Sequence, residues 1–440
     1  MQIQELLPTT ALTTPLKPAR LDGIDLLRGL VIVLMALDHT KDFFLKSGYL
    51  GDSNPAATPL ALFFTRWVTH YCAPTFVFLA GVGAFLSHRQ GDPKERLAGY
   101  LCLRGLLLVF LELTVVKFGW SWHWPLQGGT MLQVIWAIGW SMILLSFLVW
   151  LPSWFVGLIG VGIIFGHNQF DGFNGLKLLQ VDWGLAQFCG VKADWQDFFG
   201  DKGWLWDLLF VSGRAFAPGK SVFFNLYPII PWFGVLAAGY GLGAIFRWEP
   251  KDRRTLLGFL GVLLIGLFLV IRYQNGYGDP RHWQSQKEEL RTVLSFINCT
   301  KYPPSLCYLL MTLGPALICL ACFDYLMEVL RWPSSPEQSN GNMARYPKAF
   351  LRGVSGFFLV FGKVPLCFYL LHLPLIHWLA KRTADYLGQK PSPFSMGPLS
   401  KGFELPTVYG VWVCVLLLLF LPCLGYGWLK KRYGGFLKLL

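Results

Sequence analysis

Long apolar segments alternate with short polar or basic breaks along most of this chain. Ten of them are apolar enough, and close enough to the roughly 20 residues that cross a bilayer, to be expected as membrane spans. They lie near residues 27–45, 68–87, 101–117, 131–150, 154–166, 228–246, 255–271, 306–323, 357–379 and 407–428. The pattern predicts an all-α polytopic membrane protein with about ten transmembrane helices in one bundle, within a range of 9 to 12.

The polar segments do not divide this bundle into separate domains. Residues 1–19 lack the apolar core of a signal peptide, so we expect a short cytosolic N-terminal tail. Residues 20–440 then form a single transmembrane domain. Two polar insertions, at about 167–224 and 273–303, are expected on the extracytoplasmic side. Their Trp and Tyr residues suit either the aromatic belt at the membrane surface or stacking on sugar rings.

Composition supports membrane insertion and argues against nucleic-acid binding. Hydrophobic residues make up 54% of the 440 residues and charged residues 14%, with a mean hydropathy of +0.46. A soluble protein is closer to about 25% charged. The net charge of +13 comes from basic clusters that adjoin alternate apolar segments, which is the distribution expected of cytosolic loops. Both termini are therefore expected in the cytosol.

Three ionisable residues follow one face of the first apolar segment, RLDGIDLLRGLVIVLMALDHTKDFF. His39 follows Arg28 by eleven residues. In an α-helix this spacing places the two side chains on nearly the same face, about 16 Å apart along the helix axis. Asp25 lies about 40° from that line. An ionised Asp or Arg inside a bilayer costs at least about 2.5 kcal/mol, so such a stripe normally faces a protein-lined interior.

His39 is the member of this stripe that can exchange a proton near neutral pH. It is the candidate catalytic residue, with Asp25 in support. A neutral buried imidazole that donates to a backbone carbonyl is the structural alternative. Arg28 can bind a phosphate through its planar guanidinium group, or pair with Asp25 at i, i+3, and the two roles are compatible.

Two other segments add candidates. Arg66 and His70, in RWVTHYCAP, share a helix face at i, i+4. Arg66 is a second candidate for binding phosphate, and His70 is a second candidate catalytic residue or an interfacial histidine. In VPLCFYLLHLPLIHWLA, His372 and His377 would lie about 140° apart on a helix and cannot chelate together. His372 is the one expected to face the interior and is a further candidate catalytic residue, with a structural role as the alternative.

Sequence motifs of several common enzyme classes are absent. The chain has no HExxH, Walker A, GxSxG or paired-aspartate metal motif. Its ten cysteines fall mostly inside apolar segments and are interpreted as small apolar residues. The Gly239, Gly241 and Gly243 run has no βαβ context and is better explained by close helix packing. No metal is expected.

Blocks spread over nearly the whole chain resemble the heparan-α-glucosaminide N-acetyltransferase catalytic-domain family, in particular its bacterial branch. They are RLDGIDLLRGLVIVLMALDH, APTFVFLAGVGAFL, YPIIPWFGVLAAGYGLG, TKYPPSLCYLLMTLGPAL and VPLCFYLLHLPLIHWLA. The D-x-x-R-G…H pattern of the first block is also similar to that of bacterial membrane O-acyltransferases that modify cell-surface glycans.

The resemblance implies a transmembrane acyltransferase in the bacterial inner membrane. Acetyl-CoA would enter from the cytosol, and the acetyl group would end on an amino or hydroxyl group of a sugar or glycolipid at the far side. His39 would be the general base and Arg28 would meet the CoA phosphates. A transporter or flippase for a glycan or lipid precursor is the alternative, since intramembrane His and Arg also suit proton-coupled transport. The partners expected are acyl-CoA, the carbohydrate acceptor and the bilayer, with no nucleic acid; we allow for a homodimer.

Overall fold

A computed structural model describes residues 21–46, 58–88, 91–122, 129–174, 203–213, 215–216, 223–331, 342–389 and 398–434. The predicted tail, residues 1–19, and most of the 167–224 insertion lie outside these ranges. The described part is mostly helical. The N-terminal half holds α1 (Asp22–Phe44), α2 (Leu60–Thr69), α3 (Cys72–Ser87), α4 (Lys94–Leu111), the π-helix η2 (Glu112–Val116), α5 (Lys117–Ser121), α6 (Val134–Leu148) and α7 (Ser153–Gly166).

The second half continues in the same way. It holds the 3₁₀ helix η3 (His167–Asn174), α9 (Gly203–Phe210), α10 (Ile229–Leu242), the 3₁₀ helix η6 (Gly243–Arg247), α11 (Pro250–Gln274), α12 (Glu289–Ile297), α13 (Leu306–Arg331), α14 (Asn342–Gly362), α15 (Pro365–Tyr386) and α16 (Leu405–Tyr433). Proline at the first helical positions, where no backbone donor is lost, begins α11, α15 and α16. A small sheet of order β1-β3-β2 joins Thr130–Leu132, Phe223–Asn225 and Ala215–Phe216.

Fewer helices than the predicted ten are long and apolar enough to cross a membrane. Five segments of the described chain qualify by length and composition, and a sixth if a bent pair counts as one span: Leu60–Ser87, Ile229–Arg247, Pro250–Gln274, Leu306–Leu330, Leu405–Tyr433 and the pair Lys348–Gly362 with Pro365–Tyr386. By length and composition, the prediction of about ten transmembrane helices is therefore too high for the described residues. The predicted span 357–379 is interrupted by an 82° bend between α14 and α15.

The missing spans have identifiable physical reasons. α6 and α7 have 15 and 14 residues, less than the roughly 20 that cross the hydrocarbon core. α1 has 23 residues but carries several charged side chains along its length. Most of its residues are buried among protein, including Asp25 and Lys41, so its charges do not face lipid. The charged residues of α1 therefore interrupt its apolar sequence, but the helix still packs inside the bundle.

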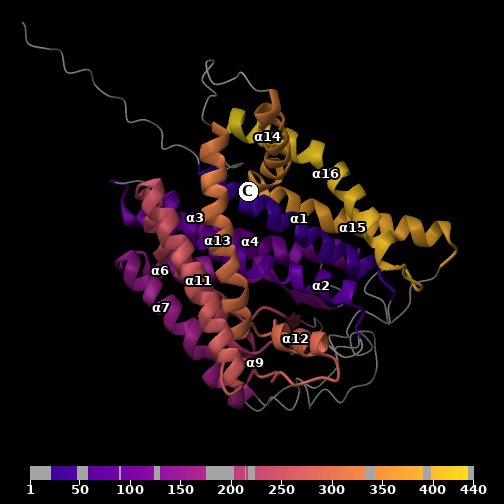
Figure 1. The fold of residues 1–440 in the computed structure, drawn as a ribbon, viewed down its shortest axis with the longest axis horizontal. Helices are drawn as coiled ribbons and strands as arrows, with labels where there is room; N and C mark the ends of the chain where they lie inside the picture. Colours follow the sequence, from indigo (N-terminus) through magenta and orange to yellow (C-terminus); the bar gives the residue numbers. More distant parts are fainter. Residues whose placement is uncertain are drawn as a thin grey trace, which may run out of the picture.

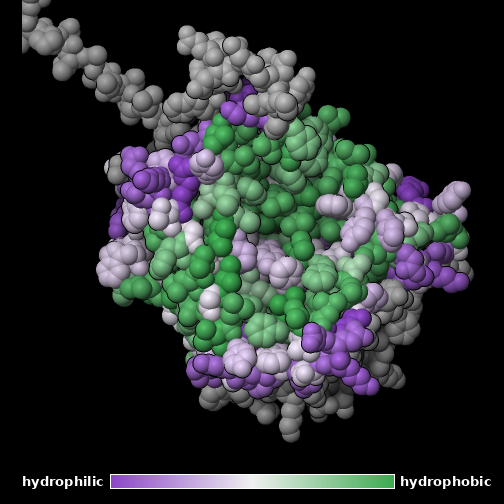
Figure 2. All heavy atoms as spheres, viewed as in Figure 1, coloured by the Kyte–Doolittle hydropathy of each residue, from purple (hydrophilic) through white to green (hydrophobic). Residues whose placement is uncertain are grey.

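α1 is the central helix of the bundle. It contacts α3 on one side and α13, α14, α15 and α16 on the others, and it runs behind α13 and α14 in Figure 1. An apolar surface covers this face of the molecule, over α13, α14 and α16, with hydrophilic residues gathered along its lower border (Figure 2). The apolar belt and the membrane-length helices identify a multi-pass membrane protein.

Close backbone approaches at glycine hold the bundle together. A Cβ on Gly29 would lie 2.0 Å from the carbonyl oxygen of Phe358, and one on Gly362 would lie 1.7 Å from that of Asp25. α1 and α14 therefore pack backbone to backbone, as small residues allow between membrane helices. The prediction for the later glycine run is confirmed in the same way, since a Cβ on Gly239 would lie 2.1 Å from the Phe78 oxygen.

Candidate active site

His39 stands near the C-terminal end of α1 in an aromatic surrounding. Its side chain is 14% exposed, and its ring centroid lies 5.1 Å from that of Trp120 and 5.3 Å from that of His372. The Nδ1 atom lies 3.5 Å from Oδ2 of Asp42, one helical turn further on. The carboxylate lies beside this nitrogen, although Nδ1 makes no hydrogen bond to another described residue.

His372 on α15 is fully buried against His39. Its Nδ1 lies 2.6 Å from the carbonyl oxygen of Tyr369 and 3.3 Å from that of Phe368. A nitrogen that faces carbonyl oxygens carries the proton, so Nε2 is the unprotonated acceptor. That Nε2 atom has no hydrogen-bond partner among the described residues. The prediction that His372 faces the interior is consistent with this placement, and its position against His39 was not predicted.

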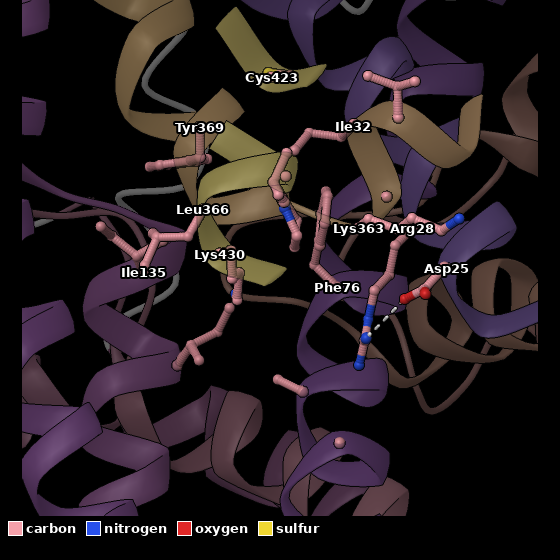
Figure 3. Close-up of a pocket in the computed structure, with 18 of the residues that line it drawn as sticks. Asp25, Arg28, Ile32, Phe76, Ile135, Lys363, Leu366, Tyr369, Cys423 and Lys430 are labelled. Atoms are coloured by element: carbon pink, nitrogen blue, oxygen red, sulfur yellow. Dashed lines mark ion pairs between the residues drawn. The ribbon is translucent and has the colours of Figure 1, made fainter. Parts of the chain in front are cut away.

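A cavity of about 940 Å³ opens between α1, α3, α4, α6, α14, α15 and α16. Its wall carries both basic and apolar side chains. Five basic side chains line it: Arg28, Arg104, Lys363, Lys430 and Lys431. Figure 3 shows Asp25, Arg28 and Lys363 on one side of the cavity and Tyr369, Leu366 and Ile135 on the other.

The two predicted polar residues at the start of α1 both line this cavity. Arg28 Nη1 lies 3.6 Å from Asp25 Oδ1, and Arg28 Nη2 donates to the carbonyl oxygen of Leu79 at 2.9 Å (Figure 3). The carboxylate and the carbonyl hold the guanidinium at the cavity wall. Asp25 therefore positions Arg28 and lies on the cavity side of the helix, apart from His39 at its other end.

Tyr369 connects the cavity to the two histidines. It lines the cavity, is 4% exposed, and its ring centroid lies 5.4 Å from that of His372. Its hydroxyl group is buried without a hydrogen-bond partner among the described residues. From the cavity, the order of contacts is thus Tyr369, then His372, then His39. The sequence analysis missed Tyr369, because its position relative to α1 depends on the bend before α15.

A compact ion cluster surrounds Asp38, the neighbour of His39. Asp38 Oδ1 accepts from Lys41 Nζ at 2.6 Å and from Thr69 Oγ1 at 3.0 Å, and its Oδ2 lies 3.5 Å from Lys301 Nζ. Burial by itself would lower the pKa of Lys301, but the Asp38 carboxylate outweighs it and raises that pKa above its ordinary value. The lysine stays charged and ties the loop before α13 to the end of α1.

Arg66 and His70 belong to this far end of α1 and not to the cavity. Thr65 shares a hydrogen bond of 2.6 Å with Tyr409 near the start of α16, whereas the cavity lysines lie near the end of that helix. The structure therefore does not bring Arg66 together with Arg28. His70 places its ring 5.7 Å from that of Tyr308, whose hydroxyl donates to the His70 carbonyl oxygen at 2.8 Å.

Other polar residues near the site have structural partners. His377 Nδ1 lies 3.0 Å from the Gly119 carbonyl oxygen, which links α15 to α5. Glu112 opens the π-helix and accepts from the backbone N–H groups of Gln133 and Trp136, so it caps the first turn of α6. Among the described residues, no group of three or more His, Cys, Asp or Glu side chains is arranged to hold a metal ion.

The remaining residues that the sequence analysis missed fall into two kinds. Asp42 follows His39 by three positions, so helical spacing alone could have found it. Arg104, Lys363 and Lys301 come from separate parts of the chain, and no local signal connects them with α1.

One family of known proteins matches this chain. The model of the family described as "Heparan-alpha-glucosaminide N-acetyltransferase, catalytic" matches residues 20–258, which is more than half of the chain and includes α1, the first part of the cavity wall and the π-helix. No curated protein is significantly similar to the chain.

Proposed function

The chain belongs to the heparan-alpha-glucosaminide N-acetyltransferase catalytic family, a family of membrane acetyltransferases, and we propose that it transfers an acetyl group from acetyl-CoA to a sugar acceptor. Acetyl-CoA enters from the cytosol into the cavity at the start of α1. The acceptor is a carbohydrate or glycolipid that offers an amino or hydroxyl group at the other end of α1. The protein resides in the bacterial inner membrane with both termini in the cytosol.

The cavity supports acetyl-CoA as the donor. CoA carries phosphates at one end and a thioester at the end of a long, mostly uncharged arm. Basic side chains from α1, α4, α16 and the link between α14 and α15 line the cavity, and guanidinium groups bind phosphate oxygens in pairs. The apolar part, with Ile135, Leu366 and Tyr369, suits the arm and the acetyl group. The volume of about 940 Å³ is in the range of ligand pockets.

His39 and Asp42 support general-base catalysis. Nε2 of His39 removes a proton from the acceptor group as that group attacks the thioester carbonyl carbon. Asp42, 3.5 Å from Nδ1, stabilises the imidazolium ion that forms. Positioned proton transfer of this kind contributes about 10²–10⁴-fold to a rate. The partly exposed His39 side chain is compatible with access from the acceptor side.

The far end of α1 supports a polar acceptor. Asp38, Asp42 and Lys301 are partly exposed, with side-chain exposures between 15% and 21%, and the buried Lys41 lies among them. Tyr302 lies beside them, with the Lys301 ammonium 5.1 Å from its ring centroid. Charged groups next to an aromatic ring offer both hydrogen bonds and a stacking face, which is what a sugar requires. His70 and Arg66 lie in the same region, and we assign them to the acceptor side.

One observation carries this proposal: a basic cavity at one end of α1 and an Asp-supported histidine at the other are joined by contacts through Tyr369 and His372. The test is CoA release from acetyl-CoA by the purified protein with amino-sugar and glycan acceptors. His39→Ala is expected to lower the rate by about 10²-fold or more. His282→Ala, an exposed histidine in the loop after α11, is the matched control and is expected to retain the wild-type rate.

Binding separates this function from transport. Acetyl-CoA at 100 times its Kd raises the stability of a protein that binds it by about 2.7 kcal/mol, which is readily seen as a higher melting temperature. A transporter of glycan precursors would show no such shift. Equal CoA release by the wild type and His39→Ala would remove His39 from the mechanism.

A further inference from the structure

We infer that the hydroxyl group of Tyr369 is a catalytic hydrogen-bond donor to the thioester carbonyl oxygen of the acyl donor. The inference rests on the proposed function and adds a residue to it. It assigns the inner, apolar part of the cavity as the place where the thioester lies.

Tyr369 lies between the cavity and the two histidines. It lines the cavity from α15, opposite the basic side that holds Arg28, as Figure 3 shows. One helical turn later on α15, the ring of His372 contacts both Tyr369 and His39. Tyr369 is therefore the cavity residue that leads to the proposed general base. A thioester that reaches it has entered the cavity to the end nearest His39.

The hydroxyl group of Tyr369 is a hydrogen-bond donor with an unmet need. The Tyr369 hydroxyl is buried and has no partner among the described residues. Leaving such a group unsatisfied costs about 1–3 kcal/mol. Tyr100, also in the cavity wall, differs in that its hydroxyl oxygen accepts from Arg104 Nη1 at 2.5 Å. A ligand carbonyl in the inner cavity would satisfy the Tyr369 hydroxyl, and Tyr100 has no such need.

Several of the residues around Tyr369 are apolar. Ile135 and Leu366 line the cavity beside Tyr369, and Phe368 and His372 are its buried neighbours on α15. A fixed donor in such a place stabilises developing negative charge far better than one in water. An oxyanion formed at the carbonyl would therefore bind Tyr369 more strongly than the ground-state thioester does.

The reaction step balances as follows. The acceptor N–H or O–H group attacks the carbonyl carbon and gives its proton to His39, while the carbonyl π electrons move to the oxygen that accepts from Tyr369. The C=O bond then re-forms and the C–S bond breaks. The CoA thiolate takes the proton that His39 received. The products are the acetylated acceptor and CoA, and Tyr369 keeps its own proton throughout.

Two donor analogues test the hydrogen bond without any turnover. The ketone analogue of acetyl-CoA, with CH₂ in place of the sulfur, keeps the carbonyl group, whereas S-ethyl-CoA lacks it. The wild type is expected to bind the ketone about tenfold more tightly than S-ethyl-CoA. Tyr369→Phe is expected to bind both analogues equally. Tyr100→Phe, the matched control in the same cavity, is expected to retain the wild-type ratio even where the two affinities change together.

Steady-state kinetics provide a second test of the Tyr369 hydrogen bond. Tyr369→Phe is expected to lower kcat for acetyl transfer by about 10²–10³-fold, with KM for acetyl-CoA within about threefold, because the donor acts on the transition state. Its melting temperature without ligand is expected to be no lower than that of the wild type, since an unsatisfied hydroxyl is removed.

The measurements distinguish a failure of the Tyr369 inference from a failure of the proposed donor cavity. No preference of the wild type for the ketone, or the same preference in Tyr369→Phe, overturns the role of Tyr369 while leaving the donor cavity in place. Binding of neither analogue overturns the donor cavity and the inference with it. If Tyr369→Phe does not fold, equal binding of the two analogues by the wild type still overturns the role of Tyr369.

Discussion

The Nδ1 atom of His39 lies 3.5 Å from the Oδ2 atom of Asp42, one turn further along the same helix. The pair needs no distant partner, because i, i+3 spacing on α1 places both side chains on one face. Lys41, between them in the sequence, also approaches Asp42, at 3.4 Å. Asp42 thus links the candidate base to the ion cluster at the far end of α1.

Asp42→Asn is expected to lower kcat for acetyl transfer by about 10²-fold with little change in the KM for acetyl-CoA. The neutral amide can neither stabilise the imidazolium ion nor hold the same proton arrangement at Nδ1. CoA release under saturating donor measures it. Asp385→Asn, an exposed residue that ends α15 near Arg382, is the control and should retain full activity. Unchanged kcat in Asp42→Asn would exclude the pair from catalysis.

Arg104→Gln is expected to weaken acetyl-CoA binding by about 10–100-fold, the loss expected when a charged hydrogen-bonding group is removed. S-acetylpantetheine, which lacks the nucleotide phosphates, should bind the variant and the wild type equally. Arg96→Gln is the matched control, since Arg96 lies on the same helix, points to solvent and pairs with Asp92. Equal losses for both ligands would place the phosphates elsewhere.

Lys301→Met is expected to lower the free energy of unfolding by about 1–3 kcal/mol, less than a fully broken buried pair because Asp38 keeps Lys41 and Thr69. A raised lysine pKa contributes stability that is fully present below the unfolded value, roughly 10.4, and is lost only as the pH rises through the higher folded value. The difference in melting temperature should therefore be constant from about pH 6 to pH 9. The exposed Lys381→Met is the control, and a difference that varied over this range would contradict the assignment.

Gly362→Ala is expected to destabilise the protein by about 1–3 kcal/mol or more, because its Cβ would meet the backbone of Asp25 at 1.7 Å. No rotamer change relieves a contact with backbone, so α14 must move away from α1 at the cavity wall, and acetyl-CoA binding should weaken as well. Gly353→Ala on the same helix meets nothing within 4 Å and should leave stability equal or slightly higher. Thermal unfolding with and without acetyl-CoA measures both effects, and two variants of equal stability would refute the close packing.

The helical architecture and the row of ionisable residues on α1 could be predicted from the sequence, because both depend on neighbouring residues. Apolar runs determine where helices form. Helical spacing places Asp25 and Arg28 in one region of α1 and His39 further along the same helix. The number of membrane-length helices did not follow. Hydropathy alone treats 357–379 as one span, whereas the tertiary structure bends by 82° between α14 and α15.

The chain by itself determined that this is a helical membrane protein with ionisable groups along its first helix, since hydrophobic spacing and helix azimuth are properties of neighbouring residues. Tertiary packing alone decided what those groups meet. The backbone contact of α14 with α1 at Gly29 and Gly362 and the bend before α15 are long-range features. They bring His372 against His39 and Tyr369 to the cavity, while the loop before α13 separately brings Lys301 to Asp38. No local pattern encodes these long-range contacts.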